Sequence, residues 1–342
     1  MIYLNKLLWF NFKLINYIAV SKNINYKINN EEITFVIQGP ILNDNNVTKK
    51  SCESIRKYFP GSQIILSTWK ESNTINLEYD HKIENNDPGS PENYFLKKEI
   101  PNNINRQIIS SYNGIKKVNT KFAVKMRSDM YFVSNKLLKL LEIVDTSKSN
   151  YSSKKIIIPS NMAINPDREY KLLFHPSDTF FAGLSKDIYE LFDIPLMDNF
   201  TMRYFKDKDT DIINYLQISS RYTCEQYIFY SYLKKKISLY FKNAFDYSKE
   251  NRVLHDKIFS NLFICIRNSK IGVNCYKHPM SYFSSTLYYA YSENEFNKIN
   301  GENDFFDFER FVSNFIRLIK SIIFFLSKSF FYKIKNFFIK KI

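Results

Sequence analysis

Three charged residues stand at the end of one apolar segment, KFAVKMRSD at residues 121–129. If this segment is extended, alternate side chains share one side, and Lys125, Arg127 and Asp129 then face the same way. Burying two cations in a core strand is costly unless they meet an anion, so we expect a diphosphate or a carboxylate opposite them. A structural ion pair between Arg127 and Asp129 at the edge of the sheet is the simpler alternative.

Arg106 and Asp87, which lie earlier in the chain than this segment, are further candidates for binding a phosphorylated ligand. Arg106 in NINRQI lies at the start of a predicted helix, where free backbone N–H groups and the helix dipole favour an anion. Its guanidinium could donate two hydrogen bonds to a phosphate, or it could be a solvated surface side chain. Asp87, in Asp87-Pro88-Gly89, could accept from a base or a ribose, or belong to a plain turn.

The glycine content excludes the common phosphate-binding loops. The chain has seven glycines, and they stand far apart, whereas a P-loop, a G-x-G-x-x-G fingerprint and a kinase glycine-rich loop need several close together. The G-x-S-x-G and H-E-x-x-H motifs are also absent, and the four histidines are dispersed. Any phosphate must therefore be bound by arginine or lysine, by a metal held by carboxylates, or by a helix N-terminus.

Net charge and cysteine content give weaker guidance. A formal net charge of +15 at pH 7 would suit a nucleic acid or a membrane, but no nucleic-acid-binding motif is recognisable, so no nucleic-acid partner is expected. The four cysteines lack the spacing of a zinc site or a disulfide framework. We therefore expect a reducing, cytoplasmic compartment.

Alternating apolar segments would position the charged residues. Short β-rich runs predict strands, and segments with apolar residues every three or four positions predict helices, the first of them capped by Thr48. This alternation favours an α/β fold with parallel strands, in which ligands gather beyond the carboxyl ends of the strands. The strands are expected at 33–38, 63–69, 121–127, 155–159 and 179–182, and the helices at 48–59, 103–118, 185–192 and 223–235.

The order of several motifs resembles the WavE lipopolysaccharide-synthesis family and the general glycosyltransferase-A layout. These motifs lie between about residues 33 and 235 and are FVIQGPI, SIRKYFPGSQIILSTW, NDPG, NINRQI and KFAVKMRSDM. The resemblance implies a glycosyltransferase-A-like (Rossmann-like) fold, with a mixed, mostly parallel sheet and helices on both faces. It also implies a nucleotide-sugar-dependent glycosyltransferase in bacterial surface polysaccharide synthesis (lipopolysaccharide core, O-antigen or capsule), acting on a lipid-linked or lipopolysaccharide saccharide acceptor. The alternative is a noncatalytic, membrane-associated scaffold of a polysaccharide assembly complex.

The resemblance also implies a donor site, in which the acidic motif departs from the usual pattern. Where an Asp-x-Asp motif would bind a divalent cation, this chain has Arg127-Ser128-Asp129. Either Asp129 alone anchors Mg²⁺ or Mn²⁺, which predicts that EDTA abolishes transfer, or Arg127 and Lys125 replace some of the metal's charge. The nucleotide-sugar-binding residues implied are Gln38, Gly39, Pro40, Thr68, Asp87, Asn105, Arg106, Lys125 and Arg127.

Two later carboxylates are candidates for the catalytic base. Asp178 lies in HPSDTFFAG at 175–183, which corresponds to a region that shapes the acceptor pocket in such enzymes, with aromatic faces stacking on sugar rings. Glu225 opens a predicted helix and resembles the late acidic position that serves as the base in inverting members of the fold. Either could deprotonate an acceptor hydroxyl, and capping of a turn or of a helix is the alternative for each.

The segment 308–342 is dense in phenylalanine and isoleucine with basic residues interleaved. On a helix, Arg310, Arg317, Lys328 and Lys335 fall on one face, which predicts an amphipathic helix at the inner face of the cytoplasmic membrane. Docking on the core or on a second copy is the alternative, and a cytoplasmic, peripheral membrane protein is expected. The expected parts of the chain are an apolar extension at 1–30, a catalytic domain at 31–290 and a basic, aromatic tail at 291–342.

Overall fold

The computed structural model describes residues 26–90, 92–95, 98–205, 219–278 and 289–301. Residues 1–25 and the whole of the amphipathic helix predicted at 308–342 lie outside these ranges. The structure therefore does not test the expectations for these two segments. Among the described residues, no helix combines the length and the apolar character needed to cross a membrane.

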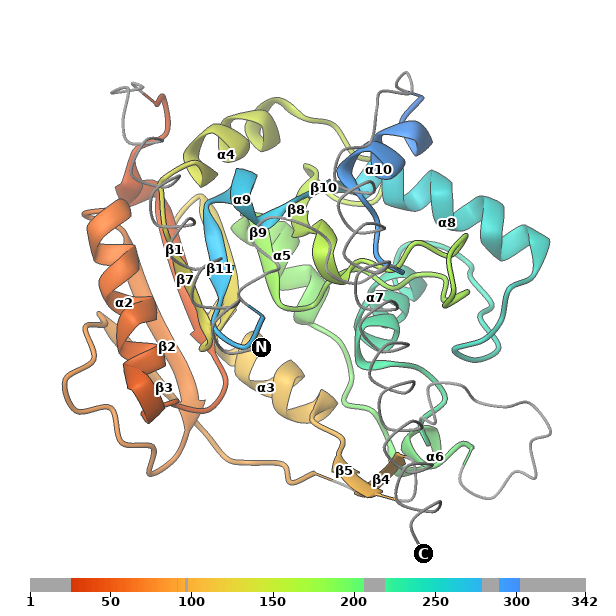
Figure 1. Ribbon diagram of the computed structural model, residues 1–342, viewed down its shortest axis with the longest axis horizontal. Helices are drawn as coiled ribbons and strands as arrows, with labels where there is room; N and C mark the ends of the chain where they lie inside the picture. The colour runs from red at the N-terminus through yellow and green to blue at the C-terminus, as the bar shows by residue number, and fades with distance from the viewer. Residues whose placement is uncertain (1–25, 91, 96–97, 206–218, 279–288, 302–342) are drawn as a thin grey trace, which may run out of the picture.

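A seven-stranded sheet forms the centre of the described fold (Figure 1). In sheet order the strands are Phe263–Ile266 (β10), Ile156–Pro159 (β8), Phe180–Leu184 (β9), Phe122–Arg127 (β6), Ile33–Gln38 (β1), Gln63–Trp69 (β2) and His81–Asn85 (β3). Only β9 is antiparallel to its neighbours in this sheet, and the other pairs are parallel. The predicted α/β fold with a mixed, mostly parallel sheet is therefore confirmed.

Hydrophobic cores cover both faces of this sheet, because alternate side chains of each strand point to opposite faces. On β1, Val36 belongs to one core, whereas Phe35 and Ile37 belong to the other. The first core includes side chains from Ile104–Ile115 (α3), Ser185–Phe192 (α5), Asn199–Met202 (α6), Cys224–Lys234 (α7), Lys249–Leu262 (α8) and Glu293–Ile299 (α10). The second core includes side chains from Val47–Tyr58 (α2), Leu137–Thr146 (α4) and Asn268–Ile271 (α9).

Helix α3 lies directly on the sheet because it carries a glycine at the contact. A Cβ atom added at Gly114 would lie 2.5 Å from Cγ1 of Val36 and 2.9 Å from Cβ of Ser67. Any side chain at this position would therefore push the helix away from β1 and β2. The close packing holds α3 against the sheet, and from the middle of the helix Ser110 donates a hydrogen bond to the side chain of Gln38 at the end of β1.

Two short antiparallel strand pairs have no counterpart in the elements expected from the sequence. Glu92–Phe95 (β4) pairs with Lys98–Pro101 (β5), and Met130–Phe132 (β7) pairs with Val273–Cys275 (β11). The second pair places Cys275 opposite Met130, and the backbone N–H of Tyr276 donates to the carbonyl of Asp129 at 2.8 Å. A segment near the end of the described chain thus lies against Asp129.

The start of α2 differs from the prediction. Its N-cap is Asn46, in a left-handed backbone conformation, and not Thr48. The hydroxyl of Thr48 instead accepts from the N–H of Leu42 at 2.9 Å and donates to the carbonyl of Ser128 at 3.3 Å. Thr48 therefore joins the loop after β1 to the end of β6, where the predicted site lies.

Helix α10 lies beyond the boundary expected at residue 290 but packs on the same core. Phe296 is buried, and Glu295 forms an ion pair with Arg168.

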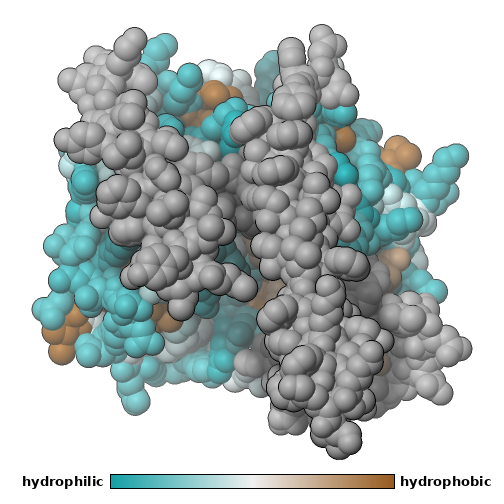
Figure 2. Space-filling view, viewed as in Figure 1, coloured by the Kyte–Doolittle hydropathy of each residue, from teal (hydrophilic) through white to brown (hydrophobic). Residues whose placement is uncertain are grey.

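On the face shown in Figure 2, the described residues are mostly hydrophilic, and hydrophobic ones are scattered. Scattered exposed hydrophobic residues are normal, but two large ones, Ile75 and Phe200, are each 75% exposed.

Candidate active site

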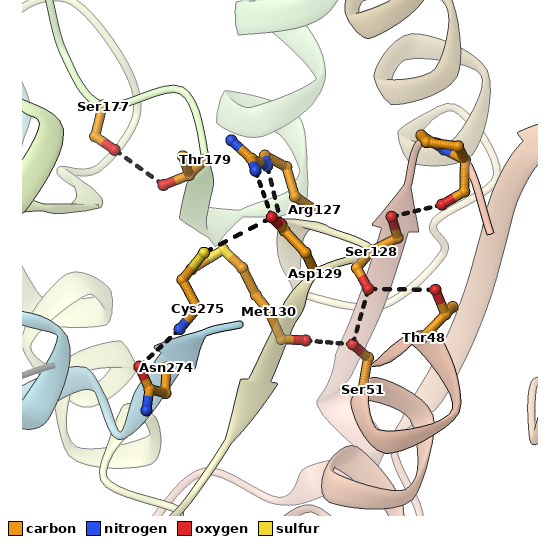
Figure 3. A network of polar contacts seen from close by, with 11 residues as sticks. Thr48, Ser51, Arg127, Ser128, Asp129, Met130, Ser177, Thr179, Asn274 and Cys275 are labelled. Atoms are coloured by element: carbon orange, nitrogen blue, oxygen red, sulfur yellow. Dashed lines mark hydrogen bonds and ion pairs between the residues drawn. The ribbon is translucent and has the colours of Figure 1, made fainter. Parts of the chain in front are cut away.

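The loop after β1 is bonded to the end of β6 through Ser128 (Figure 3). The N–H of Ser128 donates to the carbonyl of Gln38 at 3.1 Å, and its hydroxyl donates to the carbonyl of Pro40 at 2.7 Å. Gly39 between them has a φ of +110°, a conformation that favours glycine. Three of the predicted nucleotide-sugar-binding residues therefore lie beside the strand end that carries Arg127.

Arg127 and Asp129 form a two-pronged ion pair at this strand end (Figure 3). Nε of Arg127 donates to Oδ1 of Asp129 at 3.0 Å, and Nη2 donates to Oδ2. The Asp129 side chain is 2% exposed and that of Arg127 is 27% exposed. The simpler alternative from the sequence, a structural ion pair, is thus present, but its arginine remains the member that a ligand can reach.

Lys125 is fully buried on the same strand. Its Nζ donates to the backbone carbonyl of Asp178 at 2.5 Å and lies 5.8 Å and 5.4 Å from the ring centroids of Phe181 and Phe192. Burial lowers the pKa of Lys125 to about 8, and the negative charge of Asp178 opposes this change. Lys125 is therefore a cation only below about pH 8.

Asp178 lies where β6, α3 and α7 meet. Its carbonyl also accepts from Nε2 of Gln107 on α3 at 3.3 Å, and its charge shifts the pKa values of Lys125, Arg127 and Glu225. Lys125 bonds to Asp178 itself, and the N–H of Arg127 donates to the carbonyl of the adjacent Thr179 at 3.2 Å, so these side chains lie close to Asp178. Five predicted residues thus come together, and we call them the charged cluster: Lys125, Arg127, Asp129, Asp178 and Glu225.

Glu225 has a buried histidine beside it, His175, which opens the HPSDTFFAG motif but to which the sequence assigned no role. Nε2 of His175 lies 3.4 Å from Oε2 of Glu225, and the two side chains are 8% and 17% exposed. Burial raises the pKa of Glu225 to about 8, and the charge of Asp178 adds to the rise. Burial also lowers the pKa of His175 to about 4, so its ring is neutral at pH 7. A carboxyl group with a pKa near 8 is suited to proton transfer near neutral pH, and the neutral imidazole can donate a hydrogen bond to its ionised form.

The hydrogen bonds of His175 indicate which nitrogen carries its proton. Nδ1 is buried and has no hydrogen-bond partner among the described residues. In contrast, Nδ1 of His255 accepts from the N–H of Phe174 at 3.0 Å, and its Nε2 lies 3.2 Å from the hydroxyl of Tyr291. A buried N–H without an acceptor is costly, so the proton of His175 is favoured on Nε2, facing Glu225.

The start of α7 does not depend on Glu225 as its cap. Thr223 accepts from the N–H of Gln226 at 3.1 Å, and the side chain of Gln226 accepts from the N–H of Thr223 at 3.2 Å. This reciprocal pair is a capping box. Glu225 lies between these two residues and faces His175.

Three predicted donor-site residues, Arg106, Asp87 and Asn105, bond to partners outside the charged cluster. Nε and Nη2 of Arg106 donate to the carboxylate of Asp87, both at 2.7 Å, and Nη1 donates to Asn103 at 2.9 Å. A phosphate at Arg106 would therefore have to replace Asp87. The side chain of Asn105 donates to the carbonyl of Met197 at 3.0 Å and accepts from its N–H at 2.8 Å.

Two further predicted donor-site residues are buried and hydrogen-bonded to serines. The hydroxyl of Thr68 donates to Ser72 at 3.2 Å, and the side-chain oxygen of Gln38 accepts from Ser110 at 2.8 Å. These bonds fix the ends of β2 and β1. Any contact of either side chain with a nucleotide would add to these bonds or replace them.

The residues around Asp129 do not fit a metal site. Both oxygens of its carboxylate accept from Arg127, and the thiol of Cys275 lies 3.7 Å from Oδ2. In the part of the chain that the structure describes, no three histidine, cysteine, aspartate or glutamate side chains are close enough to hold a metal ion. Hard divalent cations such as Mg²⁺ and Mn²⁺ need several oxygen ligands, whereas Asp129 is already neutralised by a guanidinium.

The aromatic residues expected to stack on a sugar lie in the core. Phe180 and Phe181 are 0% and 1% exposed, and they enter the two opposite cores from β9. A strand inside a sheet that is covered on both faces buries all its side chains. The expectation that these two rings face the acceptor was therefore wrong.

Comparison with known families gives one match. A family model described as WavE lipopolysaccharide synthesis matches residues 33–329. The matched range includes the whole charged cluster and extends well beyond residue 235, where the resemblance in motifs ended. A search of curated proteins finds no match.

Proposed function

Because this chain belongs to the WavE lipopolysaccharide synthesis family, we propose that it is a glycosyltransferase that uses a nucleotide-sugar donor in bacterial surface polysaccharide synthesis. Family membership itself implies a role in lipopolysaccharide synthesis. The observation that supports the chemical proposal is the charged cluster at the carboxyl end of β6. Ligands bind at such strand ends in α/β sheets, and sugar transfer from a diphosphate needs both cations and a base.

Glu225 is the proposed base. In its ionised form the carboxylate takes the proton of an acceptor hydroxyl as that oxygen attacks the anomeric carbon of the donor sugar. The bond between the anomeric carbon and the phosphate oxygen breaks, and the nucleoside diphosphate leaves with the electron pair. Arg127 and Lys125 stabilise the charge that develops on the diphosphate.

His175 orients the proposed base. A proton on its Nε2 favours the ionised form of Glu225, which burial and the charge of Asp178 disfavour. Asp129 has a similar positioning role, since its two contacts hold the guanidinium of Arg127 in one orientation. No step in this proposal requires a metal at Asp129.

The donor side is proposed to extend along the loop after β1. Gln38, Gly39 and Pro40 lie beside the end of β6, so a nucleotide bound over this loop would place its diphosphate near Arg127. Arg106 contributes a phosphate contact only if the donor replaces Asp87, whose side chain is 42% exposed. The exposed position of this pair makes such an exchange inexpensive.

Isothermal calorimetry against UDP- and GDP-sugars, whose leaving group is a nucleoside diphosphate, tests the proposal most directly. One of these donors should bind, and Lys125→Met should weaken that binding because it removes a buried cation. Glu225→Gln should keep donor binding and lower turnover by a factor of about 10² or more, the typical contribution of a general base. Glu250→Gln, an exposed carboxylate on α8, is the matched control and should change neither quantity.

Two outcomes would contradict the proposal. Absence of binding of every nucleotide sugar would favour the noncatalytic scaffold. Near-normal turnover of Glu225→Gln would move the base role to Asp178.

A peripheral position at the inner face of the cytoplasmic membrane is proposed for the tail, which lies outside the described residues. The supporting observation is the basic, aromatic pattern of 308–342. Deletion of residues 306–342 should move the protein from the membrane fraction to the soluble fraction. An unchanged distribution would assign the tail to the core or to a partner.

A further inference from the structure

Partly exposed aromatic rings gather near α6, on a surface that the proposed mechanism does not use. Phe200 on α6 is 75% exposed. Its ring centroid lies 6.3 Å from that of Tyr204, which lies 4.9 Å from Phe205, which in turn lies 5.7 Å from Phe245. The last three rings are half-buried. These four rings form a chain of direct neighbours.

The same chain of rings continues toward the segment before α10. Phe245, Tyr170 and Tyr289 all pack against one small buried cluster of Ile164, Leu172 and Ala244. The ring centroids of Tyr170 and Tyr289 are 4.4 Å apart, and both rings are half-buried. We call the six residues the aromatic strip: Phe200, Tyr204, Phe205, Phe245, Tyr170 and Tyr289.

Arg221 ties the strip to the start of α7. Its N–H donates to the carbonyl of Thr201, and its own carbonyl accepts from the N–H of Ala244, both at 2.7 Å. Its guanidinium carbon lies 5.1 Å from the ring centroid of Tyr204. Glu225 is only four positions further along the chain, a distance of at most about 14 Å.

The other end of the strip also lies near Glu225. Burial raises the pKa of Tyr289 to about 12, and the hydroxyl of Tyr170 and the carboxyl group of Glu225 add to the rise. The N–H of Asn165 donates to the carbonyl of Tyr289 at 2.8 Å, and the N–H of the adjacent Ile164 donates at 3.1 Å to the carbonyl of His175, whose ring contacts Glu225. The strip is therefore connected to Glu225 both through Arg221 and through Tyr289.

A saccharide matches the chemistry of this strip better than a purely apolar partner does. Phe200 is exposed and the other five rings are half-buried, so each leaves part of its surface open to a ligand. Tyrosine combines an apolar face, on which the C–H groups of a sugar ring can stack, with a hydroxyl that can bond to sugar hydroxyls. Arg221 adds a charged donor beside Tyr204.

We propose that the aromatic strip binds the saccharide part of the acceptor and directs one of its hydroxyl groups to Glu225. The inference rests on the proposed function, because it treats Glu225 as the base. It replaces Phe180 and Phe181, which are buried, with partly exposed rings as the surface for sugar stacking. A substrate of several sugar units suits a strip of six rings.

Acceptor kinetics with an O-deacylated lipopolysaccharide oligosaccharide as the probe test this proposal. Phe200→Ala and Tyr204→Ala should each raise the acceptor KM by roughly three- to tenfold, the size of one aromatic contact, with an unchanged donor KM. Phe200→Trp, which keeps a stacking face, should retain the normal acceptor KM. Ile75→Ala, an equally exposed residue between β2 and β3, is the control and should have no effect.

Binding measured without turnover separates this proposal from the proposed function. In the Glu225→Gln background, calorimetry should show weaker oligosaccharide binding when Phe200 is also changed to alanine, while nucleotide-sugar binding is retained. If donor binding and turnover are normal but no strip variant changes the acceptor KM, the strip proposal fails and the proposed function survives. A changed oligomeric state on size exclusion, or a large drop in Tm, for Phe200→Ala would instead show that another copy or the chain itself covers the strip.

Discussion

The pH dependence of transfer follows from two groups of the charged cluster whose pKa values converge. As the proposed base, Glu225 would act only when ionised, and its raised pKa of about 8 restricts that form to higher pH. Lys125 supplies charge only when protonated, and its lowered pKa of about 8 restricts that form to lower pH. The two requirements overlap only around pH 8, so kcat/KM should follow a narrow bell centred there.

The height of the bell can be worked out from these values. At pH 8 about half of each group is in its active form, which gives about one quarter of the molecules with both groups active. At pH 7, about one tenth of Glu225 is ionised and about nine tenths of Lys125 is protonated, so kcat/KM should be about threefold lower. At pH 6 the same product is about 25-fold below its maximum.

A substitution at Asp178 tests whether these pKa values are the cause of the bell-shaped pH profile. Its negative charge raises the pKa of both Glu225 and Lys125, so Asp178→Asn should move both limbs of the bell to lower pH. Asp193→Asn, which removes an exposed carboxylate paired with Lys235, should leave the bell in place. The assay is kcat/KM for the donor between pH 5.5 and 10 at constant ionic strength. An acidic limb near pH 4, the ordinary range for a carboxyl group, or a bell that Asp178→Asn does not move, would refute the reasoning.

Three further predictions concern stability and the metal. Arg127→Met should lower the free energy of unfolding in urea by about 3–5 kcal/mol at pH 7, because Asp129 is 2% exposed and would keep a buried charge without a partner. Adding Asp129→Asn should recover most of that loss, and no recovery would mean that the pair is not the cause. Gly114→Ala should cost about 1–3 kcal/mol in the same assay, since its Cβ would lie 2.5 Å from Val36, and an unchanged midpoint would show that α3 can shift. Sugar transfer should continue in excess EDTA, and loss of activity that Mg²⁺ or Mn²⁺ restores would return a metal to the mechanism.

The strands that carry the site could be predicted because their sequences are short, apolar and bounded by turn residues. The segments at 33–38 and 63–69 match β1 and β2 residue for residue, and 121–127 contains β6. The end of β6 could also be identified as a site, since cations on a core strand are unusual. Local pattern was sufficient for these features.

Contacts between distant segments could not be predicted in this way. Nothing near His175 in sequence indicates that it lies 3.4 Å from Glu225, and the pairing of Arg106 with Asp87 depends on how a loop returns to α3. The short strands β7 and β11 carry too few residues to show a period of two. Phe180 and Phe181 show the opposite failure, because an aromatic pair looks the same in a sequence whether it lines a pocket or fills a core.

The pairing of β7 with β11 has a consequence for the order in which the protein becomes active during its synthesis. The thiol of Cys275 contacts the carboxylate of Asp129, 146 residues earlier in the sequence, and the N–H of Tyr276 donates to the carbonyl of Asp129. A growing chain released from the ribosome only as far as β10 would contain Asp129, Asp178 and Glu225 but would lack the strand that covers the first of them. Asp129 would therefore be covered only after most of the chain has emerged from the ribosome, and products truncated before β11 would leave it uncovered.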